Sequence, residues 1–279
     1  MNDPRPLQRP SESSTKVTSL FVRHRNALLT RACFSEMYVD SYLHLADSGV
    51  RLEPEPDRLL KEALAALVLH LGSRPWNEGT AWTVHFTEPF LNVFASGDNR
   101  SATVIAKAFT EDVRELPESL FYAQVVRDRE KPSLSAVPFA GADFFRAVEE
   151  FYARSEQRPA RYFDCGDENH AMVTAQPDCD MEWFDSLDDE AVATMAGVEE
   201  LGFLEERFYR FECGCNEARM FHTIRPLADP GPDQLFLGED TLRVTCPRCG
   251  RRYLVTREAF EAHLAAESSD RDRGDGAAA

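Results

Sequence analysis

The chain has 279 residues, 43% of them hydrophobic and 10% aromatic, enough to fill a substantial core in one large domain or two unequal ones. Its formal charge of −17 repels phosphate backbones, so nucleic acid is not an expected partner. The longest apolar run, Ala63–Leu69, is far shorter than a membrane span, so no membrane partner is expected either. An odd number of cysteines, seven, without an export signal favours a cytoplasmic location.

The N-terminal part is predicted to be strand-rich. Residues 1–16 are rich in Pro, Ser and Arg and lack apolar periodicity, which favours disorder. A first strand is expected at Val17–Val22, and the mixed pattern of Ala27–Asp47 suggests a helix that ends before Ser48. Further strands are expected at Thr80–Phe86, Phe90–Ala95, Ala102–Phe109, Leu120–Val126, Arg161–Phe163 and Met172–Gln176, with a hairpin turn at Ser96–Asn99.

Two amphipathic helices are expected to pack on this sheet. In the first, Pro56 occupies a first helical position, leucines repeat at helical spacing, and Gly72 follows as a C-cap. In the second, Asp143 caps Phe144–Glu156, which carries a buried apolar stripe. Residues 17–184 are therefore expected to form an α+β body of helices packed on a sheet.

A segment with eight acidic side chains, residues 185–210, separates this body from the C-terminal cysteines. Its spaced apolar residues are compatible with a helix, but adjacent like charges reduce the intrinsic stability of that helix. Two interpretations are open: a solvated helix that joins two domains, or a metastable segment that folds only while a neighbour holds it.

Four cysteines form two close pairs, Cys213 with Cys215 and Cys246 with Cys249. A pair separated by one or two residues can turn both sulfurs of a tight knuckle toward one point. Four thiolates at about 2.3 Å from a common centre form the tetrahedral environment of structural Zn²⁺. The sequence therefore predicts one zinc ion held by these four cysteines.

The remaining elements complete a small module over residues 211–267. Gly250, which follows the second knuckle, is expected to have a positive φ angle. A strand is predicted at Arg252–Val255, and Thr256 is expected to cap a last helix that runs through His263. Residues 268–279 are expected to be a disordered tail.

Other interpretations of the cysteines are less favoured. Two structural disulfides would require an oxidising compartment, and a cytosolic protein keeps its thiols reduced. His222 or His263 is available as a replacement ligand, but four cysteines already complete the site. Cys33, Cys165 and Cys179 are expected to be small buried residues, with Cys165 and Cys179 close together if their strands form a hairpin.

Several motifs resemble one known family, the HslO-type redox-regulated heat-shock chaperones, also called the thirty-three kilodalton chaperonin. Phe151–Pro159 is similar to the family's aromatic pair followed by Ser-Glu-Gln-x-Pro, and Ala175–Pro177 is similar to its Gln-x-x-Pro region. Leu204–Glu206 resembles the approach to the family's metal site. Cys-x-Cys, an insert of 30 residues, and Cys-x-x-Cys-Gly then follow in the family's order. The likeness covers about Ser133–Ala262, and the N-terminal half diverges.

This resemblance implies an ATP-independent holdase, not an enzyme, which is inactive while reduced and zinc-bound. In the family, neighbouring cysteines pair on oxidation, which implies the disulfides Cys213–Cys215 and Cys246–Cys249 here. Zinc would then be released, the module would unfold, and the acidic segment would lose its support. Unfolding client proteins are the implied partners, and a homodimer is implied in the oxidised state. Apolar positions expected to bind clients are Val198, Leu201, Phe203 and Leu204.

Two other classes of function are less favoured. A zinc-ribbon protein that assists transcription or binds nucleic acid, with purely structural zinc, is the alternative, but the acidic charge and the lack of a basic stripe argue against it. An enzyme is less favoured because four cysteines leave no open zinc position and the sequence lacks a Gly-rich phosphate loop.

Overall fold

The computed structural model of the protein describes residues 13–128, 130–229 and 231–275. These residues form two compact units. The first contains the chain up to Ala46 and Val50–Cys213, and the second contains Asp47–Gly49 and the chain from Gly214 onward. Among the described residues, no helix has the length and apolar character needed to cross a bilayer. The α+β class predicted from the sequence is confirmed.

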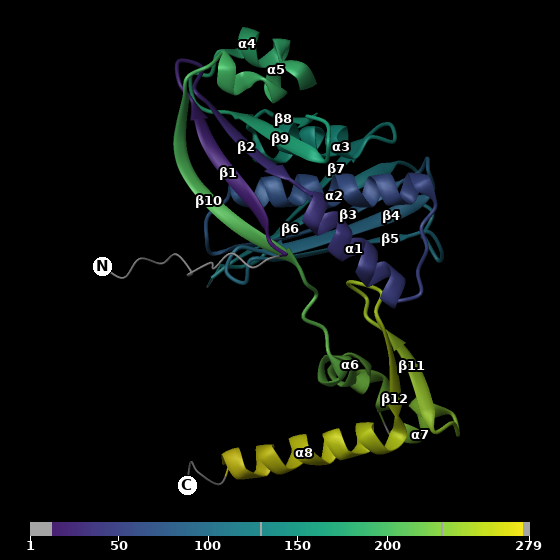
Figure 1. Ribbon diagram of the computed structural model, residues 1–279. Coiled ribbons are helices and arrows are strands. Elements are labelled where there is room, and N and C mark those ends of the chain that lie inside the picture. The colour runs from purple at the N-terminus through teal and green to yellow at the C-terminus, as the bar shows by residue number, and fades with distance from the viewer. Residues whose placement is uncertain (1–12, 129, 230, 276–279) are drawn as a thin grey trace. The chain divides into compact units, whose positions relative to one another are not determined.

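The first unit is built on a ten-stranded sheet with the order β7-β6-β3-β4-β5-β10-β1-β2-β9-β8 (Figure 1). The strands are β1 (Thr15–Val22), β2 (Ala27–Cys33), β3 (Glu78–Phe86), β4 (Leu91–Asp98), β5 (Thr103–Phe109), β6 (Ser119–Arg127), β7 (Ser133–Phe139), β8 (Ala160–Asp164), β9 (Asn169–Ala175) and β10 (Leu201–Phe211). Its α-helices are α1 (Ser35–Asp47), α2 (Pro54–Gly72), α3 (Phe144–Phe151), α4 (Met181–Ser186) and α5 (Asp189–Ala193), and α3 continues as a π-helical turn over Tyr152–Glu156.

Strand β10 joins the two halves of this sheet. On one side it pairs with β1 in an antiparallel ladder of eight residue pairs, from Val22 opposite Leu201 to Thr15 opposite Tyr209. On the other side it pairs with β5 in parallel, at two positions only, Arg210 and Phe211. The end of β10 therefore joins two groups of strands into one sheet: β10-β1-β2-β9-β8 and β7-β6-β3-β4-β5.

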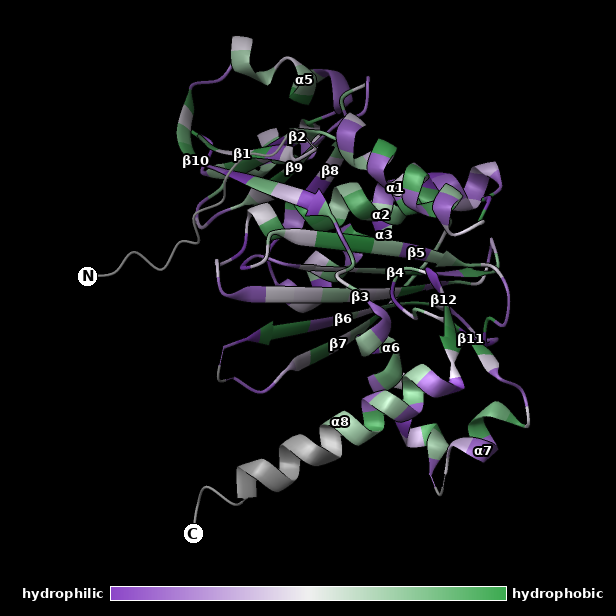
Figure 2. Ribbon diagram, turned by 60° about the horizontal axis from the view of Figure 1, so that its bottom comes forward, coloured by the Kyte–Doolittle hydropathy of each residue, from purple (hydrophilic) through white to green (hydrophobic). Residues whose placement is uncertain are grey.

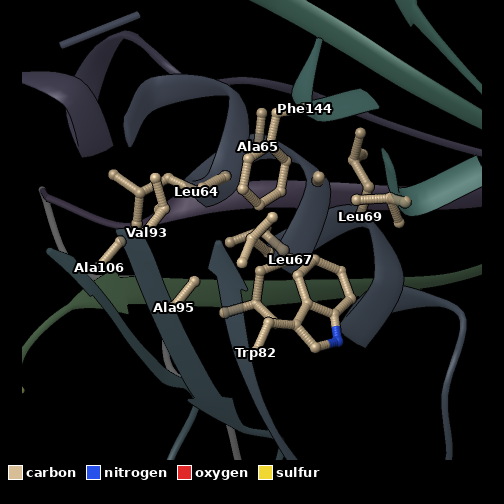
Figure 3. Packing of buried hydrophobic residues seen from close by; sticks show 14 of the residues in the cluster. Leu64, Ala65, Leu67, Leu69, Trp82, Val93, Ala95, Ala106 and Phe144 are labelled. Atoms are coloured by element: carbon tan, nitrogen blue, oxygen red, sulfur yellow. The ribbon is translucent and has the colours of Figure 1, made fainter. Parts of the chain in front are cut away.

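Helix α2 forms the centre of the core. Its leucines and alanines contact Trp82 of β3, inward-facing residues of β4 and β5, and Phe144 of α3 (Figure 3). Twelve consecutive or nearly consecutive residues of α2 are buried, so this helix is apolar on most of its surface rather than along one stripe. A Cβ at Gly97 of β4 would lie 2.5 Å from Leu71 Cδ1, so the glycine permits the close approach of helix and sheet.

The second unit contains a short two-stranded sheet and three helices. Its elements are α6 (Glu217–Ile224), a 3₁₀ turn (Arg225–Ala228), α7 (Pro232–Phe236), β11 (Thr241–Thr245), β12 (Arg252–Thr256) and α8 (Arg257–Asp275). Phe260 of α8 is fully buried, and its ring centroid lies 5.8 Å from that of Phe221 and 6.0 Å from that of Phe236. This core is small, so metal binding can contribute a large share of the unit's stability.

Several local predictions are confirmed. The Asp143 side chain accepts a hydrogen bond from the Arg146 N–H at the start of α3. Thr256 Oγ1 accepts one from the Ala259 N–H at the start of α8. Helix α2 begins at Pro54 rather than Pro56, and Gly72 is its last residue, with Ser73 as the C-cap. A Cβ at Gly72 would lie 2.8 Å from Val17 Cγ1, so the glycine permits close packing on β1.

The predicted acidic helix is wrong. Residues 185–210 form the end of α4, the short helix α5, a 3₁₀ turn and most of β10, and all of them belong to the first compact unit. Strand β10 forms because the buried Arg207 and Tyr209 alternate with the less buried Glu206, Phe208 and Arg210, while β1 supplies backbone partners. The acidic charge of the segment is compatible with a strand, because acidic side chains lie near basic ones. The Glu206 carboxylate, for example, lies 3.2 Å from Lys16 Nζ.

Other boundaries also differ from the prediction. Ala27–Cys33 is strand β2 rather than part of a helix, because it pairs with both β1 and β9. Strand β7 was not predicted, and the hairpin turn lies after Asp98 rather than over Ser96–Asn99. The first strand begins at Thr15, inside the predicted tail, whose residues 1–12 lie outside the described part. Helix α8 ends at Asp275 and so includes most of the predicted C-terminal tail, and residues 276–279 are not described.

Candidate metal centre

The four cysteines predicted as metal ligands come together at one point. Cys213 follows the end of β10 by two residues, and Cys215 directly precedes Asn216, the N-cap of α6. Cys246 directly follows β11, and Cys249 lies in the turn between β11 and β12. Their Sγ atoms all lie within 4.8 Å of one another.

The spacing of the sulfurs suits a tetrahedral ion. A tetrahedron with arms of about 2.3 Å has edges of about 3.8 Å, and the Sγ atoms of Cys215 and Cys249 lie 3.5 Å apart. Cys246 and Cys249 are buried, whereas Cys213 and Cys215 are partly exposed. The donor set of four thiols in one small volume fits Zn²⁺, which prefers this arrangement in structural sites.

Backbone geometry holds the knuckles in shape. Gly250 has a φ angle of 80° as predicted, and its N–H donates to the Cys246 carbonyl at 2.9 Å. The Cys246 N–H donates to the Arg251 carbonyl at 2.8 Å, which closes the turn between β11 and β12. Gly214, between the first two cysteines, also has a positive φ angle, 63°. Both glycines occupy a region in which an L side chain is strained.

Two further side chains contact the site: Tyr253, which was not predicted from the sequence, and Arg219, one of the arginines expected to offset the charge of the thiolates. The Tyr253 hydroxyl donates to Cys215 Sγ at 3.0 Å. Desolvation and this bond raise the pKa of the Tyr253 phenol, so it stays protonated and remains a donor. Arg219 Nη1 donates to the Gly214 carbonyl at 2.7 Å and places a positive charge beside the first knuckle. In the sequence, the signal for the Tyr253 contact is a tyrosine at the second position of the strand that follows the Cys246–Cys249 knuckle.

The two histidines weighed as replacement ligands are not members of the thiol cluster in the described residues. His222 and His263 lie side by side, with ring centroids 5.4 Å apart, and Phe221 packs against His263 at 5.0 Å. They therefore belong to the aromatic packing of α6 and α8.

The three remaining cysteines lie in the first unit as thiols. Cys33 is exposed rather than buried, because it lies at the end of β2, and its Sγ is 3.4 Å from the Ser35 hydroxyl. Cys165 and Cys179 are partly buried and pack against the smaller hydrophobic cluster of this unit. Burial raises the pKa of the Cys165 thiol to about 11, which disfavours its reactive thiolate.

The four apolar positions expected to bind clients differ in exposure. Val198, Phe203 and Leu204 have exposed fractions of 81%, 64% and 52% in the folded strand and its approach, so their exposure does not depend on unfolding. Leu201 is partly buried and packs against the smaller hydrophobic cluster. Helix α1, which carries hydrophilic and hydrophobic residues (Figure 2), also exposes apolar side chains at Val39, Tyr42 and Leu43.

Strand β10, which leads to Cys213, is anchored to the core by two buried side chains. The Arg207 guanidinium donates to the carbonyls of Leu71 at 3.0 Å and Arg74 at 2.7 Å, at and just beyond the C-terminal end of α2. The Tyr209 hydroxyl donates to Asn99 Oδ1 at 2.7 Å. The sequence did not indicate these contacts, because the partners come from segments more than one hundred residues away.

Comparison with known proteins gives three likenesses. Residues 165–256 match the model of the Hsp33 protein family. A curated 33 kDa chaperonin of Caldanaerobacter subterraneus subsp. tengcongensis is 33% identical over 63 residues, which is 23% of this chain and 21% of that relative. The matched region includes only about a fifth of the relative's length.

The solved structure of a 33 kDa chaperonin, described as a heat shock protein 33 homolog, from Thermotoga maritima is similar over nearly the whole chain. The TM-score is 0.70, and the match covers 91% of this chain and 99% of that one at 16% sequence identity. At this identity the likeness shows a shared fold. It extends across the N-terminal half, where the sequence diverges most.

Proposed function

Because the chain belongs to the Hsp33 family, we propose that it is an ATP-independent holdase chaperone of the cytoplasm, not an enzyme, which binds unfolding proteins under oxidative stress. Zinc on Cys213, Cys215, Cys246 and Cys249 would keep the reduced form inactive. The observation that carries this proposal is the convergence of four thiols within 4.8 Å, two residues after the end of β10. Nucleic acids and membranes are not proposed as partners.

The proposed switch is the oxidation of the thiol cluster. Formation of Cys213–Cys215 and Cys246–Cys249 removes two electrons from each pair of zinc-bound thiolates, and hydrogen peroxide takes up these electrons with two protons from the solvent to give two water molecules. A sulfur in a disulfide no longer acts as a thiolate ligand, so zinc is released. Zinc contributes about 10 kcal/mol or more to the folding of a small module, and the second unit has a small core of its own. Oxidation should therefore unfold that unit.

Residues 185–210 are the proposed regulatory segment, although they form helices and a strand rather than one helix. When the second unit unfolds, β10 loses its fixed end at Cys213, which weakens the hold on the strand that carries the proposed client-binding residues Leu201, Phe203 and Leu204 and on the preceding Val198. Apolar surface of this kind binds unfolded chains, and the charge of −17 keeps the complex dispersed. We propose that the oxidised protein acts as a homodimer.

The test measures zinc release and the suppression of client aggregation before and after peroxide with mild heating. Oxidation is expected to release one zinc ion per chain and to switch on suppression. Cys246→Ser should lower the zinc content and make suppression independent of oxidant. Cys33→Ser is the matched control, because this exposed thiol lies outside the cluster and should leave both properties unchanged. Retained zinc with unchanged redox dependence in Cys246→Ser would contradict the proposal.

A further inference from the structure

A cavity of about 610 Å³ lies in the first unit, lined by residues from the N-terminal parts of α2 and α3 and from the hairpin of β8 and β9. Its volume is within the range of small-molecule sites in proteins. Seven carboxylates and three cationic side chains line it, so the wall has an excess of negative charge. Neither the metal centre nor the proposed client surface includes this cavity.

The excess negative charge is concentrated at the hairpin end. Each lining cation already pairs with a lining carboxylate, in the pairs Arg58–Glu62, Lys61–Asp57 and Arg146–Glu149, at 2.6, 2.9 and 2.8 Å. Asp143 caps α3. The other three carboxylates are Asp164, Glu168 and Asp189, and none of them forms an ion pair with a lysine or arginine of the described residues.

A buried imidazole faces the same three carboxylates. His170 is 8% exposed, and its Nδ1 atom has no hydrogen-bond partner. Burial lowers the pKa of His170, although Asp164, Glu168 and Asp189 oppose that shift, so the ring is neutral at pH 7. Nδ1 lies 3.8 Å from Asp164 Oδ1, too far for a hydrogen bond.

The unpaired nitrogen of His170 is open to a ligand. No group of the described protein forms a hydrogen bond with Nδ1, and this atom lies beside Asp164 in the cavity wall. With the ring proton on Nε2, Nδ1 accepts a hydrogen bond from a ligand N–H. Asp164 Oδ1 accepts from the Gly166 N–H at 3.0 Å, and Asp189 Oδ1 accepts from the Asp164 N–H at 3.1 Å, so each of these exposed carboxylates keeps a second oxygen for a ligand. A ligand rich in N–H groups would complete these oxygens together with the buried Nδ1.

Aromatic rings form the apolar wall beside these acceptors. Phe145 stacks on Tyr162 with centroids 5.5 Å apart and planes at 14°, and its ring lies 5.6 Å from the His170 ring. Tyr38 lies 6.3 Å from His170 on another side. Aromatic faces attract cations and accommodate apolar stems.

The donor atoms are too dispersed for a metal ion. Among the described residues, the four cysteines are the one group of three or more His, Cys, Asp or Glu side chains whose ligand atoms all lie within 4.8 Å of one another. The acceptors around His170 do not form such a group. The occupant must therefore be larger than a single ion and must carry its own hydrogen-bond donors.

We propose that this cavity binds a small organic cation with an ammonium or guanidinium group, held between His170 Nδ1 and the carboxylates of Asp164, Glu168 and Asp189. The stem of the ligand lies against Phe145. This site is independent of the proposed chaperone activity and is present in the reduced, folded protein.

The test is calorimetric titration of the reduced full chain with 1,5-diaminopentane and with agmatine. Saturable binding that weakens in 0.5 M salt is expected, and 1,5-pentanediol, the uncharged analogue, should not bind. A capped lysine peptide is the second probe: tighter binding of the peptide assigns the cation to a polypeptide side chain, and tighter binding of the diamine assigns it to a free amine. Either result supports the site.

Variants locate the binding. Glu168→Gln and Asp189→Asn keep the shape and one acceptor of each side chain, and each should weaken diamine binding about three- to tenfold. Glu111→Gln makes the same charge change outside the cavity and should leave binding unchanged. The proposal is overturned if wild-type protein gives no saturable heat, if the diol binds as well as the diamine, or if Glu111→Gln weakens binding as much as the cavity variants. Because the readout is ligand binding, failure of the chaperone proposal would not affect it.

Discussion

The anchoring of β10 through Arg207 gives the sharpest test of how this strand is held. Arg207 is 4% exposed, donates to two carbonyls at the end of α2, and its guanidinium lies 4.2 Å from the centroid of the Trp76 ring. Arg207→Met keeps much of the stem but removes the donors. The carbonyls of Leu71 and Arg74 then lose partners in a place that water reaches poorly.

The magnitude follows from these contacts. Hydrogen bonds that involve a charged group contribute about 1.5–3 kcal/mol each, and a cation over an indole adds about 0.5–2 kcal/mol. Allowing for retained packing of the methionine stem, we expect Arg207→Met to lower the free energy of unfolding by about 3–5 kcal/mol. Since β10 leads directly to Cys213, we also expect partial suppression of client aggregation by the reduced, zinc-bound variant.

Urea denaturation and light scattering of a heated client, both under reducing conditions, measure these effects. Arg210→Met is the matched control on the same strand. Arg210 is about half exposed and pairs with Glu212 at 3.6 Å, so its loss should cost less than about 1 kcal/mol and leave the reduced protein inactive. If Arg207→Met unfolds at the same urea concentration as Arg210→Met and remains inactive when reduced, β10 is not anchored as we describe.

Three further outcomes are expected. Tyr253→Phe removes the O–H that donates to Cys215 Sγ and should lower zinc affinity about tenfold, as measured by competition with a chromogenic chelator, while the fold is retained. Gly97→Ala forces a Cβ to within 2.5 Å of Leu71 Cδ1 and should destabilise the first unit by about 1–3 kcal/mol in thermal melts. Burial lowers the pKa of His70 in the folded state, so below about pH 6.5 only the unfolded chain takes up this proton. The free energy of unfolding should therefore decrease by up to about 1.4 kcal/mol per pH unit as the pH falls, and urea titrations of His70→Gln should show a smaller decrease.

Features encoded by neighbouring residues could be predicted from the sequence. The two knuckles follow from spacings of one and two residues and from the positive φ angle of Gly250, all of which are local. The caps at Asp143 and Thr256 are local in the same sense, because each side chain bonds a backbone N–H three residues later. These predictions needed no knowledge of distant partners.

Features that depend on distant partners were missed. Strands β2 and β10 have mixed patterns and are stabilised by distant strands: β10 pairs with β1, where Tyr209 lies 194 residues from Thr15, and β2 pairs with β9, where Ala27 lies 148 residues from Ala175. The cavity around His170 also combines segments from α1 to α5, so no motif marks it. Tertiary pairing overrides local propensity in such segments.

The sheet topology gives the proposed switch a different physical basis from an intrinsically unstable helix. The N-terminal part of β10 is held by eight pairs to β1, but the last residues before Cys213 are held by Arg210 and Phe211 opposite β5. If the zinc knuckle that begins at Cys213 unfolds, strand separation should therefore start at that end, where few pairs must break, and should slow at the buried Tyr209 and Arg207. The instability that a holdase needs would then lie in the weak parallel junction between the two halves of the sheet, and zinc would stabilise that junction by fixing the chain directly after it.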